Sequence, residues 1–364
     1  MADLNVNSIG DASGGNTATI NGQTPTLSNM AGRNLIINGD MRIAQRGTSA
    51  TGIGLGDDGT YNTVDRWKWR YSGSITSEYT ESQSTDSPDD FSFSRKFECT
   101  TAGSGHEYIE TWQPIEAYNV AHLNYGSSAA KTLTLSFWVK CSQTGIGSVF
   151  VFAADSARSF TANYTISAAN TWEYKTITIV GDTSGTGIPS DNGEGLRISF
   201  GLAANSSYTS GTANTWAPIS NANRHAGLTL DISSGVGEYL AFTGVQLEAG
   251  SVATPFEHRQ YGTELQLCQR YFQIYGGQPG GGPNFQGYGV GDMNSVYPFT
   301  TEMRVIPTSA TSGNFQKSNS GDPAGVHTTT TATSIRVAVP SLGKFEVYPA
   351  ATTPYGKITF SAEL

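Results

Sequence analysis

Charged side chains are scarce in this chain. Asp, Glu, Lys and Arg make up only 14% of its 364 residues, about half the share of an ordinary soluble domain. Glycine alone contributes 43 residues, and Ser, Thr and Asn fill much of the remainder. This composition is typical of β-sandwiches with many turns and of fibrous or virion proteins, and it fits a metabolic α/β enzyme poorly.

A basic excess is missing as well, because the formal net charge is −9. An acidic chain has no broad attraction to phosphate backbones, so nucleic acid is not expected as a partner. No apolar run reaches the ~18 residues of a membrane span, and the N-terminus lacks the basic and apolar regions of a signal peptide. We therefore expect neither membrane insertion nor Sec-dependent export.

Cysteine is rare, with Cys99, Cys141 and Cys268 as its only representatives. The three are odd in number and widely separated, and they form no CxxC motif. This pattern argues against a disulfide framework and against a zinc site. We expect small buried hydrophobic side chains in a chain that folds in a reducing cytosol.

Short strands and Gly/Asn/Asp turns dominate residues 34–260. The stretch KTLTLSFWVK (131–140) alternates strictly, with Trp138 on its polar face. Further strand candidates are residues 176–180, 196–203, 227–233 and 239–248, and Asn192-Gly193 predicts a hairpin turn. Together these patterns predict an all-β fold in which an antiparallel jelly-roll sandwich spans residues 34–260.

The flanking segments differ from this sandwich. Residues 1–33 are polar and rich in Gly and Thr, which predicts an extended N-terminal arm. Residues 284–364 contain the strand patterns IRVAVPSLGKFEVYP and GKITFSAEL, which predict a smaller C-terminal β-sandwich domain.

A short helix is predicted between the two β-regions, within the segment 261–283 that also holds a Gly-rich linker. Leu265, Cys268 and Phe272 recur at i, i+3 and i+7, and Thr263 and Gln266 have the spacing of a capping box. We expect a helix over 263–272 whose apolar side chains pack against the sandwich and seal its base.

Five motifs in this order resemble those of a family of tailed-bacteriophage tail and fibre proteins: NLIINGDMRIAQRG, TVDRW, LTLSFWVK, FTGVQLEAGSVATPFEHR and TELQLCQRYF. The first and the last also look like motifs that bound carbohydrate-binding modules with a jelly-roll fold. The resemblance covers residues 34–275. It implies a non-catalytic structural protein of a virion appendage, such as a tail fibre, that is assembled in the host cytoplasm.

The same resemblance implies the partners. Residues 1–33 would attach the chain to other virion proteins, and the sandwich would contact glycan on the host surface. Self-association is expected independently, because few charges protect the edges of the sheets from pairing with other chains. The expected homotrimer takes its number from the resemblance alone.

Glycan contact requires exposed aromatic rings, which stack on the apolar faces of sugars. In DRWKWRY a strand places Trp67, Trp69 and Tyr71 on one face. Trp67 is expected in the core, while Trp69 and Tyr71 fit either the core or an exposed platform. Trp138 is the strongest candidate, because it lies on the polar face of its strand.

No cofactor is expected apart from a structural calcium, which the resemblance to carbohydrate-binding modules implies near Asn38, Asp40 and Glu248. The alternative is that Asp40 and Glu248 cap turns or pair with Arg42 and Arg259. We favour this alternative, because a calcium site normally gathers more than two carboxylates.

The alternative function is a glycan-degrading tailspike enzyme, which would need two carboxylates roughly 5–9 Å apart. Most acidic pairs lie in turn sequences, where Asp and Glu are ordinary residues. No internal repeat, HExxH or GxSxG motif accompanies them. We therefore expect no catalysis from the candidate pairs, which are Asp57/Asp58, Asp89/Asp90, Glu107/Glu110 and Asp191/Glu194.

Overall fold

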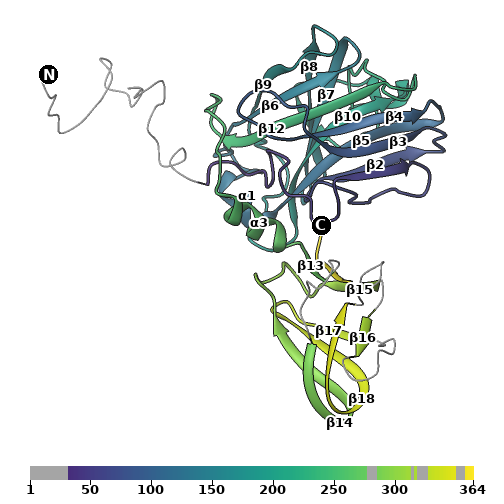
Figure 1. Ribbon diagram of the computed structural model, residues 1–364. Helices are drawn as coiled ribbons and strands as arrows, with labels where there is room; N and C mark the ends of the chain where they lie inside the picture. Colours follow the sequence, from purple (N-terminus) through teal and green to yellow (C-terminus); the bar gives the residue numbers. More distant parts are fainter. Residues whose placement is uncertain (1–31, 277–284, 313–314, 318–326, 350–356) are drawn as a thin grey trace, which may run out of the picture.

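Two six-stranded antiparallel sheets pack face to face in the computed structural model, which describes residues 32–276, 285–312, 315–317, 327–349 and 357–364 (Figure 1). Sheet A has the order β1 (Ser49–Ile53), β3 (Glu78–Ser84), β4 (Ser94–Thr101), β12 (Tyr239–Ala249), β6 (Leu133–Cys141) and β9 (Glu173–Ile179). Sheet B has the order β11 (Trp216–Pro218), β8 (Arg158–Ile166), β7 (Gly145–Ala153), β10 (Glu194–Ala204), β5 (His106–Glu116) and β2 (Lys68–Gly73). The predicted all-β jelly-roll sandwich is confirmed.

The alternation along β6 determines which side chains fill the space between the sheets. Leu133, Leu135, Phe137 and Val139 are fully buried in the main core, whereas Trp138 and Lys140 lie partly exposed on the outer face of sheet A. Because successive side chains on a strand point to opposite faces, this one strand places an aromatic ring and a cation on the surface.

Two local strand predictions are wrong. Residues 227–233 form no strand. Leu228, Leu230 and Ile232 alternate inward as predicted, but this segment lies across strand ends, with the Leu230 N–H bonded to Ile146 O at 3.2 Å. Asn192-Gly193 joins β9 of sheet A to β10 of sheet B, so the turn crosses between sheets and forms no hairpin.

Few helices interrupt the strands: α1 (Ala117–Val120), the 3-10 helix η2 (Ala121–Leu123), α2 (Ser206–Thr209) and α3 (Tyr261–Gln269). None in the described part of the chain is long and apolar enough to span a membrane. Figure 1 shows α1 and α3 at the end of the sandwich that faces the C-terminal strands.

Helix α3 differs in its ends from the prediction. Gln260 is its N-cap and no side chain caps it, so the proposed capping box of Thr263 and Gln266 is wrong. Phe272 lies on strand β13 (Phe272–Gly276), because the chain turns after Gln269 to pair with β19.

The packing role predicted for this segment is confirmed. Cys268 and Tyr271 are buried in a small cluster with Ile37 and Ile43, and Leu265 packs against its margin. Phe272 is also buried, although on a strand. The helix therefore covers the base of the sandwich next to the first described segment.

The smaller C-terminal β region consists of a three-stranded and a four-stranded sheet, with β17 paired to β18. Asn192 and Arg304 connect it to the sandwich, because the side chain of each donates to the backbone oxygen of the other, at 2.9 and 2.8 Å. Residues 1–31 of the predicted arm and 277–284 of the predicted linker lie outside the described residues. The strands are β13, β14 (Phe285–Pro298), β15 (Thr308–Ser312), β16 (Phe315–Lys317), β17 (His327–Thr330), β18 (Ser334–Pro349) and β19 (Lys357–Ser361).

Candidate functional site

Two aromatic rings lie side by side on the outer face of sheet A. Trp138 on β6 pairs in register with Tyr174 on β9, and their ring centroids are 5.4 Å apart with the planes inclined by 51°. Trp138 is partly exposed and Tyr174 is 46% exposed. Aromatic rings of this size are usually more deeply buried, so this exposed pair is the first candidate for a binding surface.

A pocket of about 640 Å³ opens beside these rings. Its second aromatic wall is formed by Phe91, Phe256 and His258, whose rings contact one another with centroids 4.9–5.5 Å apart. Ser136 and Asp90 add a hydroxyl and a carboxylate to the lining, which comprises Asp90, Phe91, Ser136, Trp138, Tyr174, Gly244, Pro255, Phe256 and His258. The pocket thus combines aromatic walls with a few polar groups.

Gly244 makes room for this wall. It lies at a bulge of β12 with φ of +62°, a conformation that glycine adopts easily. A Cβ at this position would lie 2.6 Å from the Cζ of Phe91. The glycine in the FTGVQLE motif therefore allows the Phe91 ring to lie against the strand.

The aromatic surface continues beyond the pocket through Trp172, which precedes β9. Its indole N–H donates to Asp86 at 3.0 Å, and Lys140 forms an ion pair with the same carboxylate at 2.8 Å. Burial raises the pKa of Asp86, but the hydrogen bonds from Lys140 and Trp172 outweigh it, so the net pKa is lowered. Asp86 therefore stays ionised and holds both side chains in place.

Sequence reasoning identified Trp138 but missed the other aromatic residues of this pocket. Tyr174, Phe91, Phe256 and His258 come from separate segments, and only their arrangement in the fold brings them together. The sequence contained one signal for Tyr174, because this residue lies just before the predicted TITIV strand. An antiparallel pairing of that strand with β6 places Tyr174 beside Trp138.

The prediction of Trp69 as an exposed glycan ligand is wrong. Its side chain has no exposed surface and packs between Tyr79 and Phe97 in the core. Tyr71 is only partly buried, packs against the same core and accepts the Gly56 N–H at 2.8 Å. Both residues belong to sheet B, so neither shares a platform with Trp138.

The aromatic side chains of DRWKWRY therefore stabilise the sandwich. Trp67 is fully buried, as predicted, with ring centroids 5.1 Å from Phe242 and 6.1 Å from Phe200. The tryptophans point inward and Lys68 and Arg70 lie on the other face of β2, partly exposed, whereas Arg66 is fully buried and pairs with Glu363.

The calcium interpretation does not fit the contacts of Asn38, Asp40 and Glu248. The Asn38 side chain holds its own turn by bonding Ile43 N and O at 3.0 and 2.8 Å. Asp40 pairs with Arg42 at 2.8 Å. Among the described residues, no group of three or more His, Cys, Asp or Glu side chains is arranged to hold a metal.

Glu248 caps a turn, as in the alternative that the sequence favoured. It accepts the Thr254 N–H at 2.9 Å and the Thr254 hydroxyl at 2.7 Å. Arg259 pairs with Glu257 and Glu264, at 3.5 and 3.3 Å, and not with Glu248.

The two carboxylates of the candidate pair Glu107/Glu110 have different partners and different burial. Glu107 accepts hydrogen bonds from Ser72 and Tyr208, whereas Glu110 is fully buried and pairs with Arg224 and His225. Burial raises the pKa of Glu110, but Arg224 and His225 outweigh it and bring the pKa to about 2. Glu110 is therefore ionised at neutral pH.

Ser148 completes a buried polar chain with these groups. Its hydroxyl lies 2.9 Å from His225 Nδ1, and His225 Nε2 lies 3.1 Å from Glu110. Serine, histidine and glutamate also occur together in hydrolases, but all three residues here have no exposed surface. Because no substrate can reach Ser148, the chain of contacts fixes the segment around His225 onto sheet B.

The turn prediction is wrong for Glu194, which begins strand β10 and pairs with Arg197 at 2.8 Å. Three other candidate acids support turns or loops as expected. Asp57 accepts the Gly54 N–H at 2.9 Å, Asp58 accepts the Tyr71 N–H at 3.1 Å, and Asp191 accepts the Gly193 N–H at 2.8 Å. These contacts explain the residues as local supports of the backbone.

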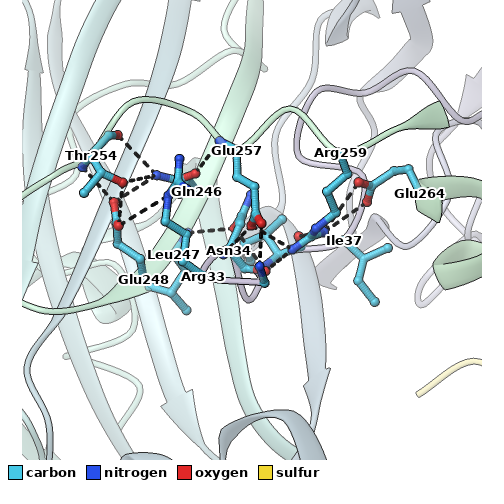
Figure 2. A network of polar contacts seen from close by, with 12 residues as sticks. Arg33, Asn34, Ile37, Gln246, Leu247, Glu248, Thr254, Glu257, Arg259 and Glu264 are labelled. Atoms are coloured by element: carbon cyan, nitrogen blue, oxygen red, sulfur yellow. Dashed lines mark hydrogen bonds and ion pairs between the residues drawn. The ribbon is translucent and has the colours of Figure 1, made fainter. Parts of the chain in front are cut away.

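Motifs that are distant in the sequence meet at the base of the sandwich (Figure 2). Asn34 contacts β12 and Glu257, the N–H of Glu257 donates to Gln246 at 2.8 Å, and Arg259 lies 3.3 Å from Glu264. The NLIINGD, VQLE, ATPFEHR and TELQLC motifs thus form one polar network. Their shared task is structural, since they join the first segment of the sandwich to its last strand and to α3.

No protein-family model and no curated protein matches this chain. Solved structures with similarity include the enzymatically active domain of bacteriophage CBA120 tailspike protein 4, at 15% identity and a TM-score of 0.31. That similarity covers 55% of this chain and only 21% of the tailspike domain.

Carbohydrate-binding modules are also among the similar structures. The family 11 module of Clostridium thermocellum, in complex with a β-1,3-1,4-mixed-linked tetrasaccharide, is 12% identical with a TM-score of 0.29, covering 58% of this chain and 98% of the module. TmCBM61, in complex with β-1,4-galactotriose, is 10% identical with a TM-score of 0.28, covering 60% of this chain and 99% of the module.

Proposed function

We propose that this chain is a non-catalytic, glycan-binding structural protein of a bacteriophage virion appendage. The observation that carries the binding function is the exposed Trp138–Tyr174 pair at the mouth of an aromatic pocket. Sugar rings present apolar C–H faces, which pack against aromatic rings, while their hydroxyls need polar partners nearby. The pocket supplies both.

The dimensions of the pocket suit a small saccharide. Its volume of about 640 Å³ falls within the roughly 300–1,000 Å³ of typical ligand sites. Ser136, Asp90 and His258 can exchange hydrogen bonds with sugar hydroxyls. The lining contains no Lys or Arg, so a neutral glycan fits this site better than an acidic one.

The virion role is supported by the five motifs and by the composition of the chain. In this proposal residues 1–33 bind other virion proteins, and the chain self-associates as a homotrimer. Chains that lack residues 1–33 should then fold normally but be absent from purified particles. Light scattering on the full chain tests the oligomer, and a stable monomer at micromolar concentration would contradict it.

The binding function is tested with the purified chain on a glycan array, followed by calorimetry with the best neutral hit. Trp138→Ala and Tyr174→Ala should each weaken binding by about tenfold, since one aromatic contact contributes roughly 0.5–1.5 kcal/mol beyond area burial. Tyr118→Ala is the matched control, because Tyr118 on α1 is 55% exposed and lies outside the pocket. Unchanged affinity of Trp138→Ala, in a variant that melts like the parent, would exclude this site.

A further inference from the structure

Three cations gather on the outer face of sheet B, on the opposite side of the sandwich from the Trp138 pocket. Lys68 on β2 pairs in register with Trp112 on β5, and Trp112 pairs with Ser199 on β10. Directly paired residues point to the same face of a sheet. Lys68 and Arg70 therefore project outward, while Trp69 between them fills the core.

These cations converge on one indole ring. The guanidinium carbon of Arg197 lies 3.5 Å from the Trp112 ring centroid, that of Arg70 lies at 4.9 Å, and Lys68 Nζ lies at 5.6 Å. Trp112 is only 3% exposed, so the cations form the outer layer and the ring supports them. Cation–π attraction stabilises this arrangement.

The positive charge of this cluster is only partly compensated. Within the described residues, the one ion pair made by these three cations joins Arg197 to Glu194 at 2.8 Å. Arg70 donates to the Tyr108 hydroxyl at 3.1 Å, and Lys68 donates to Leu364 O at 3.4 Å. The Tyr108 hydroxyl is uncharged, so the positive charge of Arg70 has no carboxylate partner among the described residues, in a chain whose overall charge is −9.

Burial, and after it the neighbouring like charges, act on the Lys68 ammonium. Burial and the neighbouring Arg197 and Arg70 lower its pKa, and they outweigh the carboxylates of Glu194 and Glu363. An anion between the three cations would remove this repulsion.

Two buried polar atoms on the same face have no partner among the described residues. The Nε1 of Trp112 and the hydroxyl of Ser199 form no hydrogen bond, although Ser199 has no exposed surface and Trp112 almost none. Buried polar atoms are normally paired. Neither atom is open to solvent, so the three cations are the groups that a bound anion can reach.

We propose that Lys68, Arg70 and Arg197 bind the carboxylate of an acidic sugar, such as a uronic acid unit in a host surface polysaccharide. A guanidinium presents paired donors that match a carboxylate, and the Lys68 ammonium adds a point charge. Because Ser199 has no exposed surface and the cations cover Trp112, the cations alone contact the bound sugar.

The test is calorimetry of the full chain with trigalacturonate and with its methyl ester, which has the same backbone without charge. The acid should bind and weaken as salt is added, and the ester should bind at least tenfold less tightly. Equal binding of both, or preference for dextran sulfate or single-stranded DNA over trigalacturonate, would overturn the proposal.

Variants locate the site. Lys68→Gln and Arg70→Gln should each reduce affinity for trigalacturonate at least fivefold, and the double variant should abolish binding. Lys131→Gln is the control, since Lys131 is exposed and lies outside the cluster. Trp138→Ala should retain full affinity, which separates this site from the neutral-glycan pocket. Parent-like binding by the double variant, with parent-like melting, contradicts the assignment.

Discussion

The Glu257 carboxylate accepts the backbone N–H of Asn34 at 2.9 Å, although 223 positions separate the two residues (Figure 2). The Asn34 side chain extends this junction by donating to Val245 O at 3.1 Å and accepting from Leu247 N at 3.1 Å. One asparagine thus takes over the pairing that a neighbouring strand would give to β12. Three of the five motifs that carry the resemblance to phage proteins, those around Asn34, Gln246 and Glu264, therefore meet where the sandwich closes.

Replacing Asn34 with Ala should therefore destabilise the whole sandwich. The substitution removes the side-chain bonds to Val245 and Leu247 and leaves buried backbone groups unpaired, at a cost of about 2–4 kcal/mol. Urea denaturation measures this loss. Asn119→Ala is the matched control, because Asn119 is exposed and should change the free energy of unfolding by less than about 0.5 kcal/mol. Equal stability of the two variants would show that the junction is dispensable.

The buried Glu110 predicts a pH dependence. Its pKa in the folded chain is about 2, below the ordinary 4.5. A depressed pKa means that the ionised group stabilises the fold above pH 4.5, and that this contribution is lost as the pH falls from 4.5 to about 2. The shift corresponds to roughly 3 kcal/mol at neutral pH.

Glu110→Gln should therefore lower the free energy of unfolding by about 3–5 kcal/mol at pH 7, because Arg224 keeps a buried charge without its partner. The gap between variant and parent should shrink by about half or more at pH 3, since only the parent has a carboxyl group that takes up a proton on unfolding below pH 4.5. Denaturation at both pH values provides the measurement. A gap that is the same at both would contradict the ionised Glu110–Arg224 pair.

The sequence predicted the alternation of several strands but not the side on which each face lies. In DRWKWRY a period of two separates Trp69 from Lys68 and Arg70, yet only the packing of sheet B against sheet A shows which face is buried. Trp138 was correctly assigned to the outer face of its strand, because the residues that alternate with it on β6 are all apolar and point to the core. The walls of its pocket could not be predicted, since Phe91 and Phe256 are brought together by long-range packing.

The end of α3 was mispredicted for a related reason. Phe272 continues the apolar spacing of Leu265 and Cys268, so periodicity extends the helix to it. The ladder with β19, in which Phe272 pairs with Ser361, ends the helix earlier. Tertiary pairing here overrides a local pattern.

Cys268 provides a test of the small cluster beneath α3. Its side chain has no exposed surface and lies with Ile37, Ile43 and Tyr271. Cys268→Ser should cost about 1–3 kcal/mol, because the new hydroxyl enters an apolar site, whereas Cys268→Ala should cost less. Thermal melts compare the two variants. A serine variant as stable as the alanine variant would mean that a polar partner is available in the cluster.

The glycine of the NGD motif gives the sharpest test of the closure. A Cβ on Gly39 would overlap the backbone oxygen of Val245, whose N–H also bonds Gly39 O at 2.9 Å. Since both sides of this contact are backbone, neither can rotate away, and Gly39→Ala should cost at least about 3 kcal/mol. Gly262→Ala is the matched control, because a Cβ there meets nothing within 4 Å on α3 and should stabilise the helix by about 0.5 kcal/mol. Chemical denaturation of both variants decides the matter: a Gly39→Ala chain as stable as the parent would mean that the first segment and β12 do not approach each other this closely.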